Sequence, residues 1–300
     1  MSADLYAATT ARIVAALEQG VAPWVRPWST GVDTLPMNAQ TGRAYRGINV
    51  VLLAMESQRQ GYALDRWLTY RQAAELGAQV RRGEQGSTVV FWRLKKFDAT
   101  ADAYPQERED DVPERVIPLL RAYTVFNVAQ VDGLPSKVHA AAKPTWEPEA
   151  RADELLLMSG ASIHHGGPVA CYRPAVDDIQ LPPRGRFPTA ASYYGTALHE
   201  LTHWTAHPKR CDRQLGKRFG DDAYAAEELI AEMGAAFLCA HCRIDGQLEH
   251  ASYVDHWLKV LRTDKRAVFV AATKAQQASD FVLKLAQPPA PQAIAAGPGC

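Results

Sequence analysis

The segment His199-Glu200-Leu201-Thr202-His203 has the residue types and the spacing of a zinc-dependent hydrolase site. Residues four apart lie on the same face of a helix, so His199 and His203 can direct both imidazoles at one ion. Glu200 is then placed to take a proton from a water on that ion. The alternative is a surface helix with two incidental histidines. Chance gives this pattern about 0.01 times per sequence of this length, so we favour the metal site.

Such a site needs a third protein ligand and an open position for water. One class of these enzymes supplies a third histidine through a motif that requires Gly and His where this chain has Ala206 and Lys209. That class is therefore excluded. His207 directly precedes Pro208, where the helix should already be ending, and a polar capping role suits it better than ligation.

The next helical segment, residues 224–238, offers carboxylates instead. Glu228 and Glu232 are four apart on one stripe of a small, apolar sequence. We assign Glu228 as the third ligand and Glu232 as an acid that hydrogen-bonds a ligating histidine. Glu227, about 100° further around the helix, is the rival ligand. Gly234 would let this helix approach the histidine helix closely, which argues against all three acids being solvated.

The chemistry expected of this site is hydrolysis of a peptide bond in an unidentified protein substrate. Zn²⁺ would polarise the scissile carbonyl and Glu200 would act as general base, although another divalent ion such as Mn²⁺ could occupy the site. Four residues are candidates to donate a hydrogen bond to the oxyanion: Tyr193, Tyr194, His207 and Arg210. Cys239 and Cys242 lie in an apolar helical run, and we interpret them as structural cysteines rather than a second metal site.

The first 96 residues combine a positive charge with many aromatic side chains. They hold twelve Lys and Arg against seven Asp and Glu, a net charge of +5. Cations that neutralise phosphates and rings that stack on bases are typical of proteins that bind single-stranded DNA, although many of these rings could simply be core. The candidate DNA-binding residues are Trp24, Arg26, Trp28, Arg43, Tyr45, Arg46, Arg81, Arg82, Trp92, Lys95 and Lys96.

Two strand-like runs flank an acidic stretch in this part of the chain. Residues 87–94 and 116–131 are rich in β-branched and aromatic side chains, which predicts two pairing strands. Between them, residues 97–115 carry two basic and seven acidic residues. We expect this insert to be the mobile tip of a hairpin. Helices are expected over residues 3–19, 46–61, 69–80, 150–160 and from 190 onward, and a short hairpin between 168 and 183.

These elements predict an α+β chain with two domains, each with its own core. N-terminal helices would pack on a small antiparallel sheet in a single-stranded-DNA-binding domain over residues 1–135. A linker would follow at 136–148, because three prolines lie between 134 and 148. A mostly helical zincin-like metallopeptidase domain would occupy 149–286, and residues 287–300 would form a disordered tail.

Composition narrows the class of protein further. The chain has 300 residues, of which 47% are hydrophobic and 22% charged, which is typical of a soluble globular protein. No apolar run approaches the length of a membrane helix, and the N-terminus lacks the features of a signal peptide. Five cysteines form no disulfide-like framework. We therefore expect a cytoplasmic protein without a membrane partner.

The motifs of both halves resemble the ArdC-type antirestriction proteins of conjugative plasmids, whose N-terminal module also precedes some plasmid primases. The resemblance covers nearly the whole chain. It is carried by WVRPW, NAQTGRAYRGIN, RRGEQGSTVVFW and YTVFNVAQVDGLP in the first half, and by YYGTALHELTHWTAHPKR and YAAEELIAEMGAAFL in the second.

This resemblance implies an N-terminal domain that binds single-stranded DNA, a zincin-like C-terminal domain, and protection of incoming plasmid DNA from host restriction during conjugation. It supports His199, Glu200, His203 and one acid of the YAAEELIAE segment as site residues, without choosing between Glu228 and Glu227.

A different class of protein remains open: a non-proteolytic protein that shields DNA and keeps a structural or regulatory metal site. The intact Glu200 favours the enzyme, because a structural site has no use for a general base. A metal-dependent nuclease is disfavoured, since no second carboxylate-rich cluster accompanies the motif.

Overall fold

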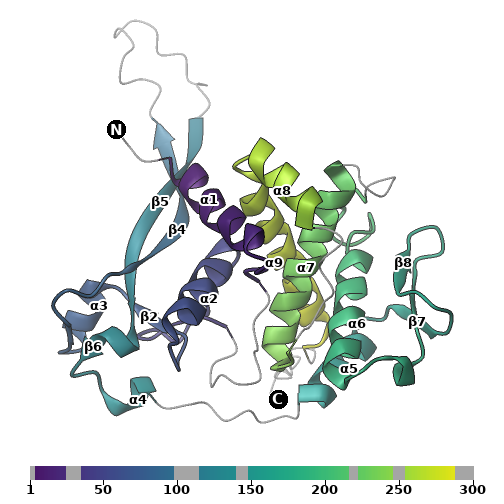
Figure 1. Ribbon diagram of the computed structural model, residues 1–300, viewed down its shortest axis with the longest axis horizontal. Coiled ribbons are helices and arrows are strands. Elements are labelled where there is room, and N and C mark those ends of the chain that lie inside the picture. Colours follow the sequence, from purple (N-terminus) through teal and green to yellow (C-terminus); the bar gives the residue numbers. More distant parts are fainter. Residues whose placement is uncertain are drawn as a thin grey trace, which may run out of the picture.

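The structure, a computed structural model, describes residues 4–24, 35–97, 115–139, 148–215, 222–245 and 254–287. A small sheet with its helices lies on the left of Figure 1, a central group of helices follows, and a half with a second sheet lies on the right. This mixed architecture confirms the predicted α+β class. Most of the acidic insert, most of the predicted linker and all but the first residue of the predicted tail lie outside the described residues.

The N-terminal sheet is built around one long hairpin. Its strand order is β1 (Met37–Asn38), β2 (Arg66–Leu68), β5 (Arg115–Asn127) and β4 (Ser87–Phe97). Strands β4 and β5 pair antiparallel from Ser87–Val125 to Phe97–Arg115, which confirms the predicted hairpin. The sequence predicts an antiparallel sheet. In the structure the β1–β2 pair is parallel, and the other pairs of this sheet are antiparallel. A separate short ladder joins β3 (Gln79–Val80) to β6 (Val131–Asp132).

Helix α2 (Ile48–Gln60) packs on β4, and α1 (Leu5–Glu18) packs on α8 (Val254–Thr263) of the second half. The Asn49 side chain fixes α2 to the hairpin by donating to the Val90 carbonyl (2.7 Å) and accepting from the Val90 N–H (2.8 Å). Short helical segments complete this half: α3 (Tyr70–Glu75), η1 (Val128–Gln130) and α4 (Ser136–His139), the last at the start of the predicted linker.

Helix α3 is shorter than the helix predicted over residues 69–80. Gly77 adopts a left-handed φ of 73°, and the Ala78 N–H donates to the Ala73 carbonyl (2.9 Å). This is the hydrogen-bond pattern of a glycine-terminated helix, and it turns the chain into β3. Sequence periodicity missed it because Gly77 lies inside an otherwise helical run.

The second half consists mainly of helices. They are α5 (Pro148–Met158), η2 (Arg184–Arg186), α6 (Ala190–Trp204), α7 (Asp222–Cys242), α8 and α9 (Ala267–Leu285). Its sheet has the order β7 (Ser162–His165), β9 (Asp178–Leu181), β8 (Cys171–Arg173). The antiparallel β8–β9 pair is the short hairpin predicted from the sequence, and it leaves β8 at one edge of the sheet.

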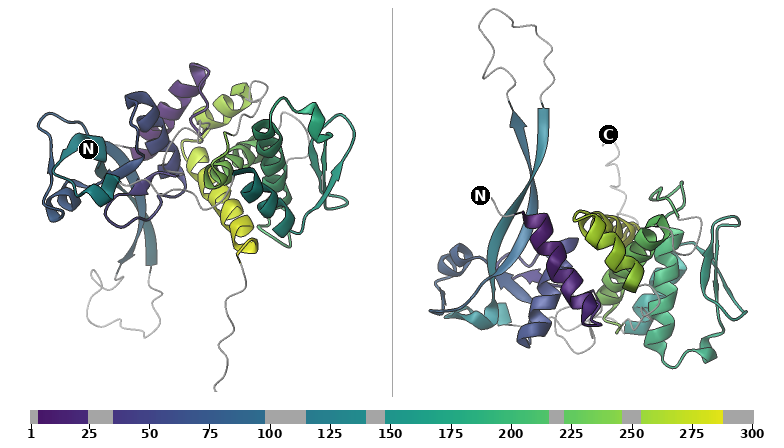
Figure 2. Two further views of the ribbon diagram at one scale, coloured as in Figure 1. Left: turned by 90° about the horizontal axis from the view of Figure 1, so that it is seen from below. Right: turned by 45° about the horizontal axis from the view of Figure 1, so that its top comes forward.

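Helix α7 lies at the centre of the molecule, between α6 on one side and α8 and α9 on the other (Figures 1 and 2). One hydrophobic cluster contains Leu17 of α1, Val51 of α2, Phe237 of α7, Trp257 of α8 and Val268 of α9. The two halves therefore share part of their core, whereas the sequence predicts a separate core for each. None of the described helices is long and apolar enough to cross a membrane.

Candidate metal centre

Helix α6 carries both histidines of the motif and is positioned by its contact with α7. Thr189 caps α6 by accepting the Ser192 N–H (3.0 Å). At the α6–α7 crossing, a Cβ added to Gly234 would lie 2.5 Å from Cγ2 of Thr202. Real side chains do not approach so closely, so only glycine permits this helix separation. The close approach predicted from Gly234 is confirmed.

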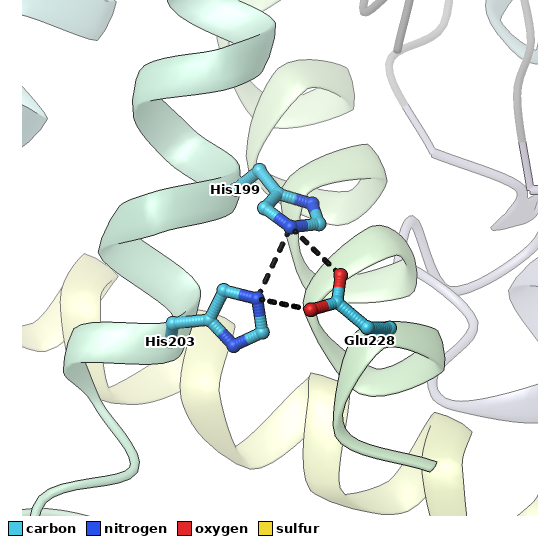
Figure 3. A group of neighbouring side chains, drawn as sticks. All are labelled: His199, His203 and Glu228. Carbon is cyan, nitrogen blue, oxygen red and sulfur yellow. Dashed lines mark hydrogen bonds and ion pairs between the residues drawn. The ribbon is translucent and has the colours of Figure 1, made fainter. Parts of the chain in front are cut away.

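His199, His203 and Glu228 converge on one point between these helices (Figure 3). The two Nε2 atoms are 3.1 Å apart. The Glu228 oxygens lie 3.4 Å from His199 Nε2 and 3.6 Å from His203 Nε2. Donors that surround Zn²⁺ tetrahedrally at 2.0–2.1 Å are separated by about 3.3 Å. The three donor atoms therefore have the types and the spacing of a metal site with room for a further ligand.

Two other acids face the outer nitrogens of the histidine rings. Glu227 Oε1 lies 3.3 Å from His203 Nδ1, and Glu232 Oε1 lies 3.8 Å from His199 Nδ1. The Glu227 contact is a hydrogen bond, and such a bond orients a ligating imidazole and increases its basicity. The distance from Glu232 is too long for a hydrogen bond, so the bond predicted from Glu232 to a ligating histidine is not formed in this structure. Glu227 also accepts two hydrogen bonds from Arg213, at 2.7 and 3.0 Å. This geometry favours Glu228 over Glu227 as the third ligand.

The site concentrates negative charge in a buried environment. Glu227, Glu228, Glu232 and Glu200 are all buried, and Arg213 is the guanidinium that pairs with one of them. Burial by itself raises the pKa of Glu228, but the two histidines outweigh burial and lower it far below its usual range. Burial lowers the pKa of His203, yet hydrogen bonds to Glu227 and Glu228 raise it to about 10. Such a site favours occupation by a cation, here protons or a metal ion.

The carboxylate of Glu200 is held beside this centre by strand β8. Its Oε2 accepts the backbone N–H of Tyr172 at 2.7 Å. A cavity of about 270 Å³ opens here, and Glu200, both histidines and Glu228 line it. Glu200 thus faces the same space as the three donor atoms, which is where a general base must lie.

The four candidate oxyanion donors do not line this cavity. Tyr193 is buried and its hydroxyl lies 3.0 Å from His165 Nε2, while Arg210 forms an ion pair with Asp177. The tyrosines that do line the cavity are Tyr172 and Tyr224. Sequence reasoning missed both because they come from β8 and from the start of α7, outside the motif helix.

The cysteine pair of α7 is structural, as predicted. Cys239 and Cys242 are fully buried in the hydrophobic cluster that also contains Leu198 and Leu201 of the motif helix. Burial raises the pKa of both thiols, that of Cys242 to about 12. Among the described residues, His199, His203 and Glu228 form the one cluster with metal-binding geometry.

Two family models match the chain in succession. Residues 3–126 match the N-terminal domain of anti-restriction factor ArdC, and residues 150–274 match a zincin-like metallopeptidase. The crystal structure of the metal-free antirestriction ArdC protein from plasmid R388 is 43% identical with a TM-score of 0.78, and the match covers 94% of this chain and 98% of that one. This chain belongs to the ArdC antirestriction family.

A second crystal structure of the R388 ArdC protein, in a Mn(II)-bound form, is 40% identical with the same TM-score of 0.78; it covers 96% of this chain and all of that chain. The uncharacterized protein y4eC of Sinorhizobium fredii is 41% identical, and the match covers 93% of this chain and 91% of that one.

Two DNA primases named TraC from Escherichia coli are 42% and 41% identical over 92% of this chain, yet the chain spans only 27% and 20% of their length. The predicted family is confirmed, with an ArdC N-terminal domain followed by a zincin-like domain.

Two aromatic residues of the matched N-terminal region are buried, contrary to the prediction that they stack on DNA. Trp24 is only 2% exposed and packs edge-on against Trp257 of α8, with ring centroids 5.4 Å apart. Tyr45 is buried with Leu53 and Trp67 between the sheet and α2. Both rings belong to hydrophobic clusters, although Tyr45, which is 8% exposed, also lines a surface groove.

Unlike these two aromatic residues, the arginines predicted for DNA binding that the structure describes lie on the surface. Arg43, Arg46, Arg81 and Arg82 are exposed. Arg46 pairs with Asp280 of α9, and Arg81 pairs with Glu84 (2.7 Å) and Asp132 (3.3 Å). Two further candidates, Arg26 and Trp28, lie outside the described residues. Trp92, Lys95 and Lys96 belong to β4, but their side chains are not described.

Proposed function

We propose that this chain protects incoming plasmid DNA from restriction during conjugation, as a protein that binds single-stranded DNA and carries a metallopeptidase site. Membership of the ArdC family supports the antirestriction role. The observation that carries the enzymatic part is the position of Glu200, whose carboxylate shares one cavity with His199, His203 and Glu228. A structural metal site has no chemical need for a fourth, proton-accepting carboxylate in that position.

The residues that would hold a divalent ion are His199, His203 and Glu228, and Zn²⁺ or Mn²⁺ fits their nitrogen and oxygen donors. When bound, such an ion polarises a carbonyl oxygen and lowers the pKa of water. Glu200 accepts the proton of the attacking water, and the Tyr172 N–H keeps its carboxylate directed at the cavity. Glu227 keeps the His203 imidazole oriented through its hydrogen bond, and the buried Glu232 adds negative charge beside His199.

The small sheet of the second half ends in an edge strand beside the cavity, which gives a place for a polypeptide substrate. Strand β8 lies at that edge and its residues Cys171 and Tyr172 line the cavity beside Glu200. An extended peptide that pairs with a strand edge gains main-chain hydrogen bonds and exposes its own backbone carbonyls. A protein in an extended conformation therefore suits this cavity as the substrate class.

The test is a DNA-protection assay combined with metal analysis on the wild type and on Glu200→Ala. Loss of protection with metal content unchanged would support peptidase chemistry as the function. Glu154→Ala removes an exposed carboxylate from α5 and serves as the control, which should protect normally. If Glu200→Ala protects as well as the wild type, the protein acts by shielding DNA and its metal site is structural or regulatory.

A further inference from the structure

A groove of about 740 Å³ lies where the N-terminal hairpin meets α9. One wall consists of β4 and β5 residues, among them Phe91 and Tyr123. The opposite wall consists of α9 residues Thr273, Gln276 and Gln277. Figure 1 shows that α2 lies between this sheet and α9, so the N-terminal end of α2 and the segment before it form the base of the groove. Both halves of the chain therefore build it.

The hairpin wall presents an exposed aromatic pair. Phe91 and Tyr123 are 46% and 44% exposed, and their rings make an edge-to-face contact with centroids 5.6 Å apart. Among the aromatic side chains that the structure describes, the other strongly exposed one is Tyr70. Exposed rings cost free energy in water, and two in contact on one wall are a platform on which a planar ligand can stack.

Cations border this platform. Arg121 is directly opposite Phe91 in the β4–β5 register, so both side chains point to the same face of the hairpin. Arg43 lines the groove. Both arginines are exposed, and neither has an ion-pair partner within the part of the chain that the structure describes. Asp280 is the acid of the groove, and Arg46 neutralises it. The groove therefore has an aromatic surface bordered by two arginines that pair with no acid of the described residues.

Two contacts fix the α9 wall to the base of the groove. The Gly47 N–H donates to Gln276 Oε1 at 3.0 Å, and Arg46 pairs with Asp280. Gln276 also donates to Asp280 Oδ1 at 3.0 Å, which links the two contacts. The walls are thus held together before any ligand arrives, which reduces the entropy lost on binding.

We propose that this groove binds single-stranded DNA. Unpaired bases stack on Phe91 and Tyr123, phosphates contact Arg43 and Arg121, and α9 closes the site from the zincin-like half. Stacking platforms combined with cations select single strands, because the bases of a duplex are already stacked on one another. This inference rests on the proposed function, whose DNA-binding activity it assigns to a particular surface. An unstructured peptide is the competing occupant, and the exposed Arg43 and Arg121 favour a polyanion.

The experiment measures binding of the full-length protein to an oligothymidylate of about 16 nucleotides, the upper end of the sites covered by one such binding module. Phe91→Ala combined with Tyr123→Ala should weaken binding about tenfold or more, since each lost stacking contact costs about five- to hundredfold in affinity. Tyr70→Ala, which removes an exposed ring outside the groove, is the matched control and should bind normally.

A second variant tests the contribution of α9. Gln277→Glu places a negative charge in the groove and should weaken DNA binding and make it more sensitive to salt. Leu157→Glu adds the same charge at a 78% exposed position of α5 and should have no effect. Both variants leave the hydrophobic core intact, so thermal unfolding should match the wild type.

The outcomes separate this inference from the proposed function. If the wild type binds no single strand, the DNA-binding part of the proposed function is wrong and the groove proposal falls with it. If the wild type binds but the groove variants bind equally well, or Tyr70→Ala weakens binding as much as they do, only the groove is wrongly assigned. Equal affinity for a duplex, or stronger binding of a polyglutamine peptide than of oligothymidylate, would also overturn it.

Discussion

Arg213 and Glu227 form a buried ion pair in which the Arg213 Nη2 atom lies 2.7 Å from Glu227 Oε1. Arg213 is fixed in turn by Thr205 Oγ1 and the Thr202 carbonyl, each at 2.8 Å. Glu227 therefore reaches His203 from its outer side with its charge already neutralised. Glu228, the next residue, has no such guanidinium partner among the described residues, and its carboxylate faces the Nε2 atoms of both histidines. The Arg213 ion pair thus distinguishes two adjacent glutamates: Glu227 contacts the outer nitrogen of His203, and Glu228 faces the candidate metal position.

This division predicts different effects of two neighbouring substitutions. Glu228→Gln replaces a charged ligand with a neutral amide and should abolish stoichiometric binding of Zn²⁺ or Mn²⁺. Glu227→Gln should retain the ion with affinity reduced about 10- to 100-fold, because only the orientation of His203 is affected. Competition with a chromophoric chelator measures both affinities. Glu154→Gln, a change on the exposed surface of α5, is the control. The assignment is wrong if Glu227→Gln loses the ion and Glu228→Gln keeps it.

The contact between Gly234 and Thr202 predicts a specific packing defect. Gly234→Ala places a methyl group 2.5 Å from Thr202 Cγ2 and should destabilise the protein by about 1–3 kcal/mol, with weaker metal binding as α6 and α7 separate. In a Thr202→Ala background the Thr202 atom that remains near this methyl group is Cβ, at 3.3 Å. The double variant should therefore lose less stability than the two single changes summed. Denaturant melts of the four proteins measure this coupling, and simple additivity would contradict the contact.

Chelation of the ion should lower the melting temperature but leave unfolding cooperative. Removing a bound cation leaves several buried carboxylates with less compensation, and ligand binding at 100 times the dissociation constant stabilises a protein by about 2.7 kcal/mol. The R388 ArdC protein matches this fold equally well in its metal-free and Mn(II)-bound crystal structures, so the fold should survive without the ion. Calorimetry with and without EDTA is the measurement. Loss of any thermal transition after chelation would contradict this expectation.

The motif helix and the residues of the candidate metal site could be anticipated from the sequence because they depend on local spacing. A period of 3.6 residues places His199 and His203 on one face of α6, and Glu228 and Glu232 on one face of α7. Gly234 signals close approach of two helices, which the structure confirms. The hairpin could also be predicted from the sequence, because its two strands follow one another along the chain and pair with each other.

Features that depend on distant segments could not be anticipated. Arg213 reaches Glu227 only after the chain has turned back beyond α6, and no spacing rule places it there. Trp24 was expected to be exposed because an aromatic residue among cations has the composition of a DNA-binding surface, yet it packs on Trp257, far away in the sequence. The α9 wall of the groove likewise comes from residues more than 140 positions after the hairpin.

Metal binding should become stronger as the pH rises. In the metal-free protein, burial opposes protonation of His203, but hydrogen bonds to Glu227 and Glu228 outweigh it and raise the pKa to about 10. His203 is therefore protonated at neutral pH, and an ion can bind only by displacing that proton. Apparent affinity should rise about tenfold per pH unit while one proton is displaced, up to the pKa of the metal-free site. Isothermal titration calorimetry from pH 6.5 to 9 in buffers of different ionisation enthalpy measures both the affinity and the proton release.

The raised pKa of His203 also predicts that the metal-free protein becomes less stable as the pH rises, whereas its metal affinity increases. A histidine whose pKa is higher in the folded state contributes stability that is complete below its unfolded value of about 6.5 and is lost as the pH rises through the folded value. Metal-free protein should therefore become less stable between pH 7 and 10, whereas the metal-saturated protein should show no such decline from His203. Glu227→Gln removes one of the two carboxylates that raise the His203 pKa and should make the decline shallower. A metal-free protein whose stability and metal affinity are both constant from pH 7 to 9 would show that His203 is neutral in the absence of the ion.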